Sequence, residues 1–119
     1  MIRKVRLVTI AVRDQERSLA FFRDKVGLKV LLDEHEADGS RWIELIAPDG
    51  GSTIALVKAG VDEKVGSFSN VVFGCDNVYN TCHDLKSRGV CFVAEPVEES
   101  WGTFAVFRDP DGNSFVVAS

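Results

Sequence analysis

The first half of the chain changes its hydrophobic spacing from a strand pattern to a helix pattern and back. The β-branched run at 7–12 predicts a strand. Leu19 and Phe22 then recur at the spacing of one helix face, with Asp14 as N-cap before this helix and Gly27 at its end. A polar, exposed loop is expected at 33–39. Further strands are predicted at 28–32, 41–46 and 53–57.

The second half of the chain repeats this order of elements. A helix is predicted at 77–88, where Val78, Cys82 and Leu85 share one face. Strands are predicted at 70–75, 90–94, 103–107 and 114–117. Each half therefore has the order strand, helix and three strands, or βαβββ.

Two landmarks recur at one common offset along the chain. The intervals from Asp14 to Gly27 and from Asp76 to Gly89 are both 13 residues long, and the second starts 62 positions after the first. A Pro-Asp-Gly turn at 48–50 likewise returns 62 positions later at 110–112. A shared offset indicates an internal duplication. We expect one domain over 1–119, built from a first module at 1–59, a connection at 60–68 and a second module at 69–119.

The expected fold class is α+β, with two tandem βαβββ modules. Neither module alone covers its sheet. We therefore expect the modules to form a pseudo-symmetric, cup-shaped mixed sheet around a shared concave surface, with the helices on the outer face. Such sheets have edge strands, which a second copy of the chain usually covers, so a homodimer is expected.

Charge and cysteine content exclude several classes of function. The formal net charge is −4, and the Lys and Arg residues are scattered, so the basic stripe of a nucleic-acid-binding protein is missing. Apolar runs stay far below the roughly 20 residues of a membrane span. Three cysteines at uneven spacing match neither a zinc site nor a disulfide framework. We expect a cytoplasmic protein that contacts neither nucleic acid nor membrane.

Several motifs at these intervals resemble the vicinal-oxygen-chelate superfamily, which includes glyoxalases, epimerases, extradiol dioxygenases, fosfomycin-modifying enzymes and bleomycin-binding proteins. Val12-Arg13-Asp14 followed by residues 18–28 is similar to the first helix signature of that family. Trp101-Gly102-Thr103 leading to residues 107–113 is similar to its closing hairpin. The resemblance covers essentially the whole chain, and it implies the glyoxalase/bleomycin resistance fold.

The resemblance also implies four positions for metal ligands, two in each module. Metal-dependent members carry His or Gln on the opening strand of a module and Glu on its closing strand. In this chain the four positions are Leu7, Ala55 (Ile54 if the register is shifted by one), Asn70 (or Ser69) and Val116. None is a histidine or a carboxylate, and one neutral oxygen does not hold a transition metal. We therefore expect neither a metal nor another cofactor.

Trp42 and Glu44 are the polar and aromatic candidates on a strand next to the expected cavity. The turn after this strand leaves its register open by one residue. Glu44 is then either a polar anchor or general base with a raised pKa, or an outward-facing strand residue, or a partner of Arg41. If both residues face inward, the cavity is lined by Leu7, Thr9, Trp42, Glu44, Ala55, Asn70, Val72, Trp101 and Val116.

The other candidate residues have simpler explanations. His35 falls in the polar loop and His83 on the second helix, and both are expected at the surface. Trp42 and Trp101 either stack on a planar ligand or pack within the protein. Asp109 and Asp111 belong to a Pro-Asp-Gly turn, which explains them without a metal.

Three functions compete on this sequence. The first is a binding protein for a hydrophobic or aromatic small molecule, a metabolite or an antibiotic, as in the bleomycin-binding relatives. The second is an enzyme of the family, such as a lyase, isomerase or dioxygenase, which uses either unorthodox metal ligands or Glu44 as a base. The third is a dimerising interaction module. Retention of the fold beside loss of the ligand residues favours the first.

Overall fold

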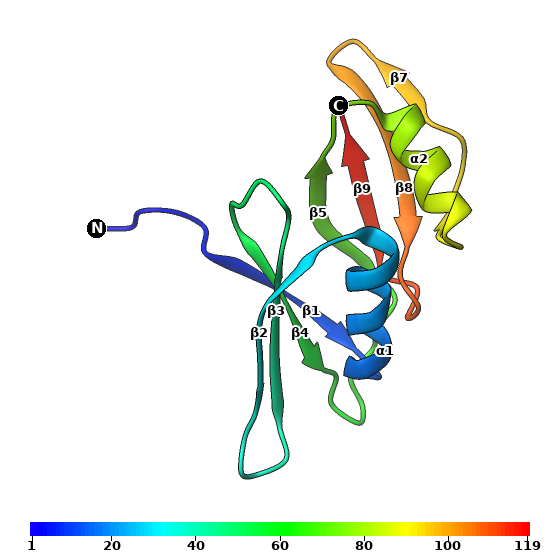
Figure 1. The fold of residues 1–119 in the computed structure, drawn as a ribbon. Coiled ribbons are helices and arrows are strands. Elements are labelled where there is room, and N and C mark those ends of the chain that lie inside the picture. Colours follow the sequence, from blue (N-terminus) through cyan, green and yellow to red (C-terminus); the bar gives the residue numbers. More distant parts are fainter. The chain divides into compact units, whose positions relative to one another are not determined.

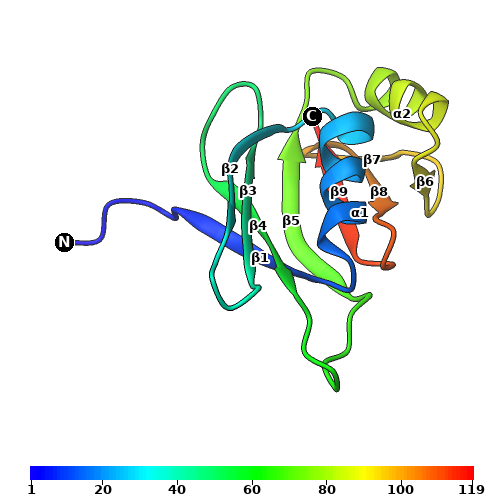
Figure 2. The same cartoon turned by 60° about the horizontal axis from the view of Figure 1, so that its bottom comes forward.

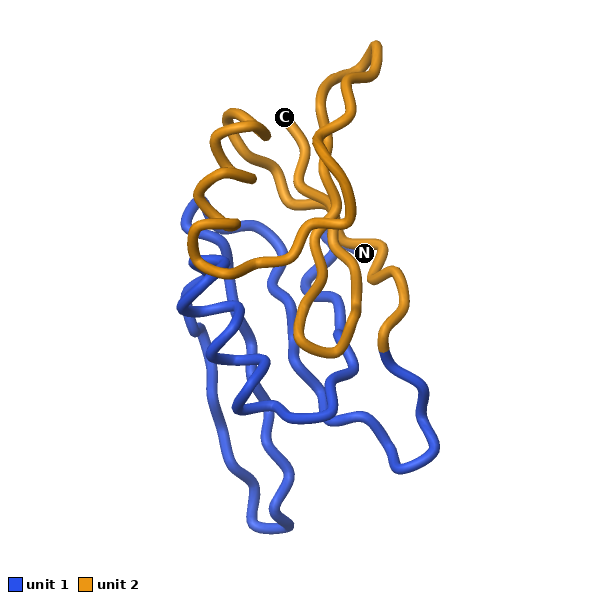
Figure 3. The backbone as a smooth tube through the Cα atoms, turned by 90° about the vertical axis from the view of Figure 1, so that its right-hand side faces the viewer, with its two compact units in different colours: residues 1–65 blue, residues 66–119 orange.

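The computed structural model describes residues 1–119 and divides them into two compact units. Unit 1 contains Met1–Val65 and unit 2 contains Gly66–Ser119 (Figure 3). Each unit has one sheet and its own helix. Unit 1 has the βαβββ order that the sequence predicts, and unit 2 has this order with one additional short strand. None of the helices is long and apolar enough to cross a membrane.

The sheet of unit 1 has four strands in the spatial order β1-β4-β3-β2. Figure 1 labels these strands together with the helix of this unit. β1 runs parallel to β4, and the other neighbours are antiparallel. The strands are β1 (Leu7–Val12), β2 (Lys29–His35), β3 (Arg41–Ile46) and β4 (Thr53–Lys58).

The helix of unit 1 follows the expected boundaries but changes its type halfway. α1 (Gln15–Ala20) continues as a π-helical segment, η1 (Phe21–Val26). The Asp14 side chain caps α1 by accepting from the backbone N–H of Arg17 at 3.0 Å. Gly27 ends the helix with a φ of 91°, which a residue without a Cβ adopts at little cost.

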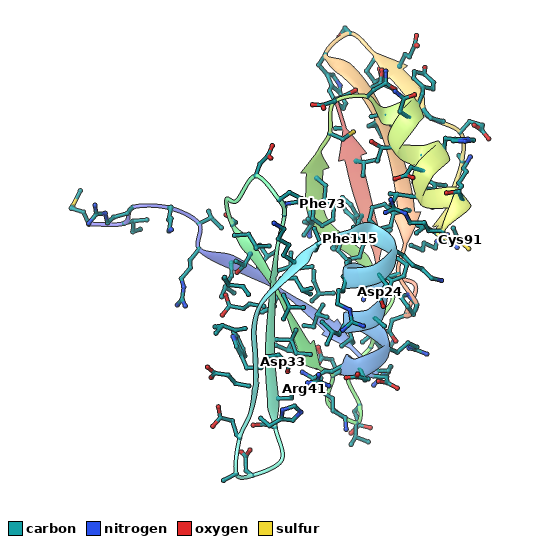
Figure 4. All side chains as sticks on the ribbon, in the orientation of Figure 1. Asp24, Asp33, Arg41, Phe73, Cys91 and Phe115 are labelled. Atoms are coloured by element: carbon teal, nitrogen blue, oxygen red, sulfur yellow. The ribbon has the colours of Figure 1, made fainter.

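β2 is longer than predicted, and the loop expected at 33–39 is correspondingly shorter. His35, expected in that loop, is the last residue of β2, although it is exposed as predicted. The Asp33 carboxylate accepts two hydrogen bonds from the Arg41 guanidinium, at 2.8 and 2.7 Å (Figure 4). This ion pair lies across the β2–β3 ladder, so a polar segment is held in strand form by its partner strand.

The sheet of unit 2 has the order β5-β9-β8-β6, with a short strand β7 that also pairs with β8. α2 contacts β6 and β8 (Figure 2). The elements are β5 (Phe68–Gly74), α2 (Val78–Ser87), β6 (Cys91–Phe92), β7 (Val97–Glu99), β8 (Gly102–Arg108) and β9 (Ser114–Ala118).

The strand predicted at 90–94 is wrong in extent, because only the two residues of β6 form there. The short strand β7, which follows it, was not predicted. The sequence around β7 is polar and contains Pro96, which hides the strand from a hydrophobic pattern. The core of unit 2 is aromatic. Phe107 stacks on Phe115 with ring centroids 5.5 Å apart, and Phe73 stacks on both rings (Figure 4).

Candidate functional site

The helix of unit 1 covers one face of its sheet. The Gln15 side chain of α1 donates to the carbonyls of Arg41 and Leu56, at 2.7 and 2.9 Å, and Glu16 forms an ion pair with Arg41 at 2.6 Å. The side chain of Arg41 therefore lies on the helix side of β3. We call the opposite side, which this helix leaves uncovered, the open face of unit 1.

Register and alternation place the candidate residues of the first module on this open face. Glu44 lies opposite Ala55, and Ala55 lies opposite Thr9 on the next strand. Successive side chains of a strand point to opposite faces, so Trp42 lies on the same side as Glu44 and opposite to Arg41. Leu7, two positions before Thr9, shares this side. All five candidates of the first module are thus on one face of one sheet.

The uncertainty between Ala55 and Ile54 is settled by the pairing of β4. Ile54 lies opposite Leu45, and both are buried on the helix side. Ala55 is therefore the residue of β4 that belongs to the open face. Its side chain is a single methyl group and offers no metal ligand.

Glu44 is a buried carboxylate held by two neutral donors. Its side chain is 3% exposed. Trp42 Nε1 donates to Oε2 at 2.7 Å, and Thr53 Oγ1 donates to Oε1 at 2.9 Å. The hydrogen bond from Trp42 is the main cause that lowers the pKa of Glu44; desolvation opposes it, and the Thr53 bond and the charge of Arg6 add to the lowering.

Two expectations for Glu44 are therefore wrong. Its pKa is lowered instead of raised, because hydrogen-bond donors outweigh the effect of burial. An ionised carboxylate with a lowered pKa is a weaker general base than the sequence suggested. Glu44 is also no partner of Arg41, whose guanidinium binds Asp33 and Glu16 on the other face of the sheet.

Unit 2 has an open face of the same kind. Phe115 and Val117 of β9 are buried in the aromatic core on the α2 side, so Val116 between them points to the opposite side. Val116 lies opposite Val72 on β5 and opposite Val106 on β8. A row of three valines consequently crosses the sheet at the last metal-ligand position implied by the resemblance.

Trp101 adds an exposed aromatic surface to this open face. Its ring stacks on Phe104 with centroids 5.7 Å apart and an interplanar angle of 16°. Phe104 alternates with Ala105, which is buried on the α2 side, so the stacked pair lies on the open side of β8. Trp101 remains 66% exposed. One face of the indole is thus occupied by Phe104, and much of the rest of the side chain is accessible.

Asn70 occupies an irregular part of β5. The ladder pairs Phe68 with Ser114 and then Val72 with Val116, so β5 carries extra residues between these pairs. Asn70 has a φ of 64°, and an asparagine tolerates this left-handed conformation better than most residues. The side-chain hydroxyl of Ser69 donates a hydrogen bond to the backbone carbonyl of Ser114 at 2.7 Å. Alternation does not extend through this irregularity.

The donor set of these faces does not fit a divalent metal ion. Leu7, Ala55 and Val116 present hydrocarbon at three of the four implied positions, and Asn70 presents a neutral amide. Residues 1–119 contain no group of three or more His, Cys, Asp or Glu side chains arranged to hold a metal. His83 is exposed on α2. Asp109 accepts from the backbone N–H groups of Asp111 and Asn113, at 3.0 and 2.8 Å, as expected of a turn residue.

Four residues of the open faces were missed by sequence reasoning. Thr53 and Leu32 flank Glu44 in unit 1, while Val106 and Phe104 lie on β8 in unit 2. Thr53 lies two positions before Ala55 on the same strand, and Phe104 lies two positions before Val106. Strand alternation therefore predicts that each shares a face with that neighbour. Leu32 carried no such signal, because the pairing of β2 shifts between Val30 and Leu32.

Comparisons with known proteins agree with this geometry. The protein YetH of Bacillus subtilis (strain 168), which is uncharacterized, is 33% identical over 98% of each chain. The lactoylglutathione lyase of Haemophilus influenzae is 26% identical over 87% of this chain and 82% of its own. The solved structure of TnmS3, an antibiotic binding protein from Streptomyces sp. CB03234, superposes with a TM-score of 0.87 and 31% identity, covering 98% of this chain and 95% of that one.

The family model matches nearly the whole chain, over residues 4–117. It covers both units, including the strands that carry the two open faces. The chain therefore belongs to the Glyoxalase/Bleomycin resistance protein/Dioxygenase superfamily.

Proposed function

We propose that this protein binds a hydrophobic or aromatic small molecule, a metabolite or an antibiotic, on its open faces and without a metal. The observation that carries the proposal is the Trp101–Phe104 stack. An indole that is backed by a second ring and still 66% exposed is a ready surface for a planar ligand. A second tryptophan, Trp42, lies on the open face of unit 1 and has its orientation fixed by Glu44.

The surroundings of the two tryptophans support this proposal. Ligand sites for small molecules are mostly apolar and carry a few fixed polar groups. Each open face has this character by itself: that of unit 2 presents Val72, Val106 and Val116, and that of unit 1 presents Leu7 together with the buried carboxylate of Glu44. The similarity to TnmS3, an antibiotic binding protein, supports an antibiotic as one such ligand.

A thermal-shift screen of planar aromatic compounds and antibiotics tests the proposal. A ligand present at 100 times its Kd stabilises the folded protein by about 2.7 kcal/mol. We expect at least one member of a broad panel to raise the unfolding temperature. A panel that leaves this temperature unchanged throughout would contradict the proposal.

Substitution of Trp101 tests whether the Trp101–Phe104 stack binds the ligand. Trp101→Ala should raise the dissociation constant of such a ligand by about two- to tenfold, since ring stacking contributes about 0.5–1.5 kcal/mol beyond area burial. Trp101→Phe should restore most of the loss. Tyr79→Ala is the matched control, because Tyr79 is an exposed aromatic residue on α2. Equal losses in the Trp101→Ala and Tyr79→Ala variants would contradict a role for the stack.

We also propose that two copies of the chain associate through β2. This strand is the edge of its sheet, and Val30, Leu31 and Leu32 are exposed on it, Leu31 to 52%. Leu31→Lys should convert a dimer to a monomer in light scattering, whereas Val61→Lys, at an exposed position outside any strand, should not. A wild-type chain that remains monomeric at all concentrations would contradict this association.

A further inference from the structure

Glu44 is the one ionisable residue in a row of side chains that crosses the open face of unit 1. The row consists of Thr9, Ala55, Glu44 and Leu32, each opposite the next across the four strands. Glu44 is 3% exposed, and each of its oxygens accepts one hydrogen bond from a neutral group. The row thus places a fixed negative charge among apolar and hydroxyl side chains.

This charge has no ion-pair partner. Glu44 takes part in no ion pair, and the pairs of Arg23 with Asp24 and of Arg41 with Glu16 and Asp33 lie elsewhere in unit 1. Arg6 is the cation whose charge acts on Glu44, but it is exposed and forms no salt bridge with it. Its ionised form is thus held by two neutral donors, and no cation of the protein pairs with its charge.

The carboxylate also retains unused capacity to accept hydrogen bonds. An ionised carboxylate offers about four acceptor sites, of which Trp42 and Thr53 use two. The indole of Trp42 leads directly to it, because Nε1 and Oε2 are 2.7 Å apart. A molecule that contacts the edge of this indole brings its own substituents within reach of the carboxylate.

We propose that Glu44 is the recognition group for a protonated amine on the ligand. This inference rests on the proposed function, because it assigns one chemical feature to the molecule bound there. An ammonium group donates charge-assisted hydrogen bonds to the free acceptor sites, and these are stronger than bonds between neutral groups. It also supplies the cation that Glu44 lacks within the protein. A carboxylate at the same place on a ligand is repelled.

Three planar probes with matched rings test the assignment: naphthylmethylamine, naphthylmethanol and naphthylacetate. Calorimetric titration of the full chain at physiological salt gives the three dissociation constants. We expect the amine to bind about tenfold more tightly than the alcohol, which is the range of one charge-assisted hydrogen bond, and the acetate to bind most weakly. Equal affinities for amine and alcohol, or tightest binding of the acetate, would overturn the inference without any variant being needed.

Two isosteric substitutions separate Glu44 from the general negative charge of the protein. In Glu44→Gln the amide can accept from Trp42 and donate to Thr53, so both local contacts persist and only the charge is removed. The amine-to-alcohol ratio should then fall to about one. Asp62→Asn removes an exposed carboxylate outside every strand, away from the row that contains Glu44, and should leave the ratio unchanged. Equal effects of the two variants would contradict recognition by Glu44.

The outcomes also distinguish this inference from the proposed function. If the amine and the alcohol bind equally well, the protein still binds aromatic ligands and only the role of Glu44 is wrong. If none of the three probes binds and the wider panel also fails, the proposed function is contradicted, and the amine site with it.

Discussion

Trp42 donates its indole Nε1–H to Oε2 of Glu44 across two positions of β3, at 2.7 Å. The two side chains share one face because they are two residues apart on a strand. Each fixes the other: the carboxylate orients the ring, and the ring keeps the carboxylate ionised. The polar centre of this open face is therefore set by one pair of residues, with Thr53 as the second donor.

Loss of the indole donor should destabilise the fold. Trp42→Phe keeps an aromatic ring but leaves Oε2 of Glu44 without its donor. The free energy of unfolding at neutral pH should fall by about 1.5–3 kcal/mol, the range for a hydrogen bond to a charged group. Denaturant unfolding measures it, with Trp101→Phe as the exposed control. Equal, small changes in both variants would show that the bond contributes nothing.

The same bond predicts how stability depends on pH. The pKa of Glu44 is lowered in the folded protein, so its contribution is fully present above the ordinary glutamate value of 4.5 and is lost as the pH falls through the lowered folded value. Glu44→Gln lacks this component. The difference in unfolding free energy between wild type and Glu44→Gln should thus shrink on acidification below pH 4.5. A difference that stays constant throughout the acid range would contradict the lowered pKa.

Removal of an unsatisfied hydroxyl should stabilise unit 1. Ser18 on α1 is fully buried, and its Oγ has no hydrogen-bond partner. Ser18→Ala removes this polar group and introduces a better helix former, so stability should rise by about 1 kcal/mol. Ser87→Ala serves as control, because its Oγ donates to the carbonyl of Asp84 at 2.6 Å and its removal should not stabilise. Thermal unfolding of both variants checks the sign.

Gly102 at the start of β8 should not tolerate a side chain. Its φ is 149°, and a Cβ there would lie 2.3 Å from the backbone oxygen of Ser119. Gly102→Ala should lower the free energy of unfolding by about 1–3 kcal/mol, since backbone must move to relieve the contact. In Gly74→Ala a Cβ meets nothing within 4 Å, so that variant is the matched control. Similar stabilities of the two variants would contradict the close approach.

The elements that the sequence predicts best are those whose signals are local. The Asp14 cap, the apolar spacing of α1 and the left-handed Gly27 lie within one segment, and the structure has the helix between them. β7 could not be predicted in this way. Val97 and Glu99 are strand residues because they pair with Phe104 and Gly102, and a hydrophobic pattern contains no record of that pairing.

The candidate site also has features that follow from local sequence and features that depend on pairing between strands. Alternation within strands is enough to group Trp42 with Glu44 and to put Val116 opposite the aromatic core. Alternation does not show that the indole Nε1–H of Trp42 turns toward the carboxylate, and this hydrogen bond is the main cause of the lowered pKa of Glu44. The second donor, Thr53, comes beside Glu44 only through the pairing of β3 with β4. The expected raised pKa was wrong because a carboxylate in an apolar strand suggests desolvation alone.

Metal-independent binding of an aromatic small molecule is tested most directly by one titration. The tightest compound of the panel is titrated into the full chain by calorimetry, once in plain buffer and once after treatment with excess EDTA. We predict the same dissociation constant in both, because the positions of Leu7, Ala55 and Val116 offer no metal ligands. Loss of binding after chelation, restored by adding a stoichiometric divalent metal, would contradict it.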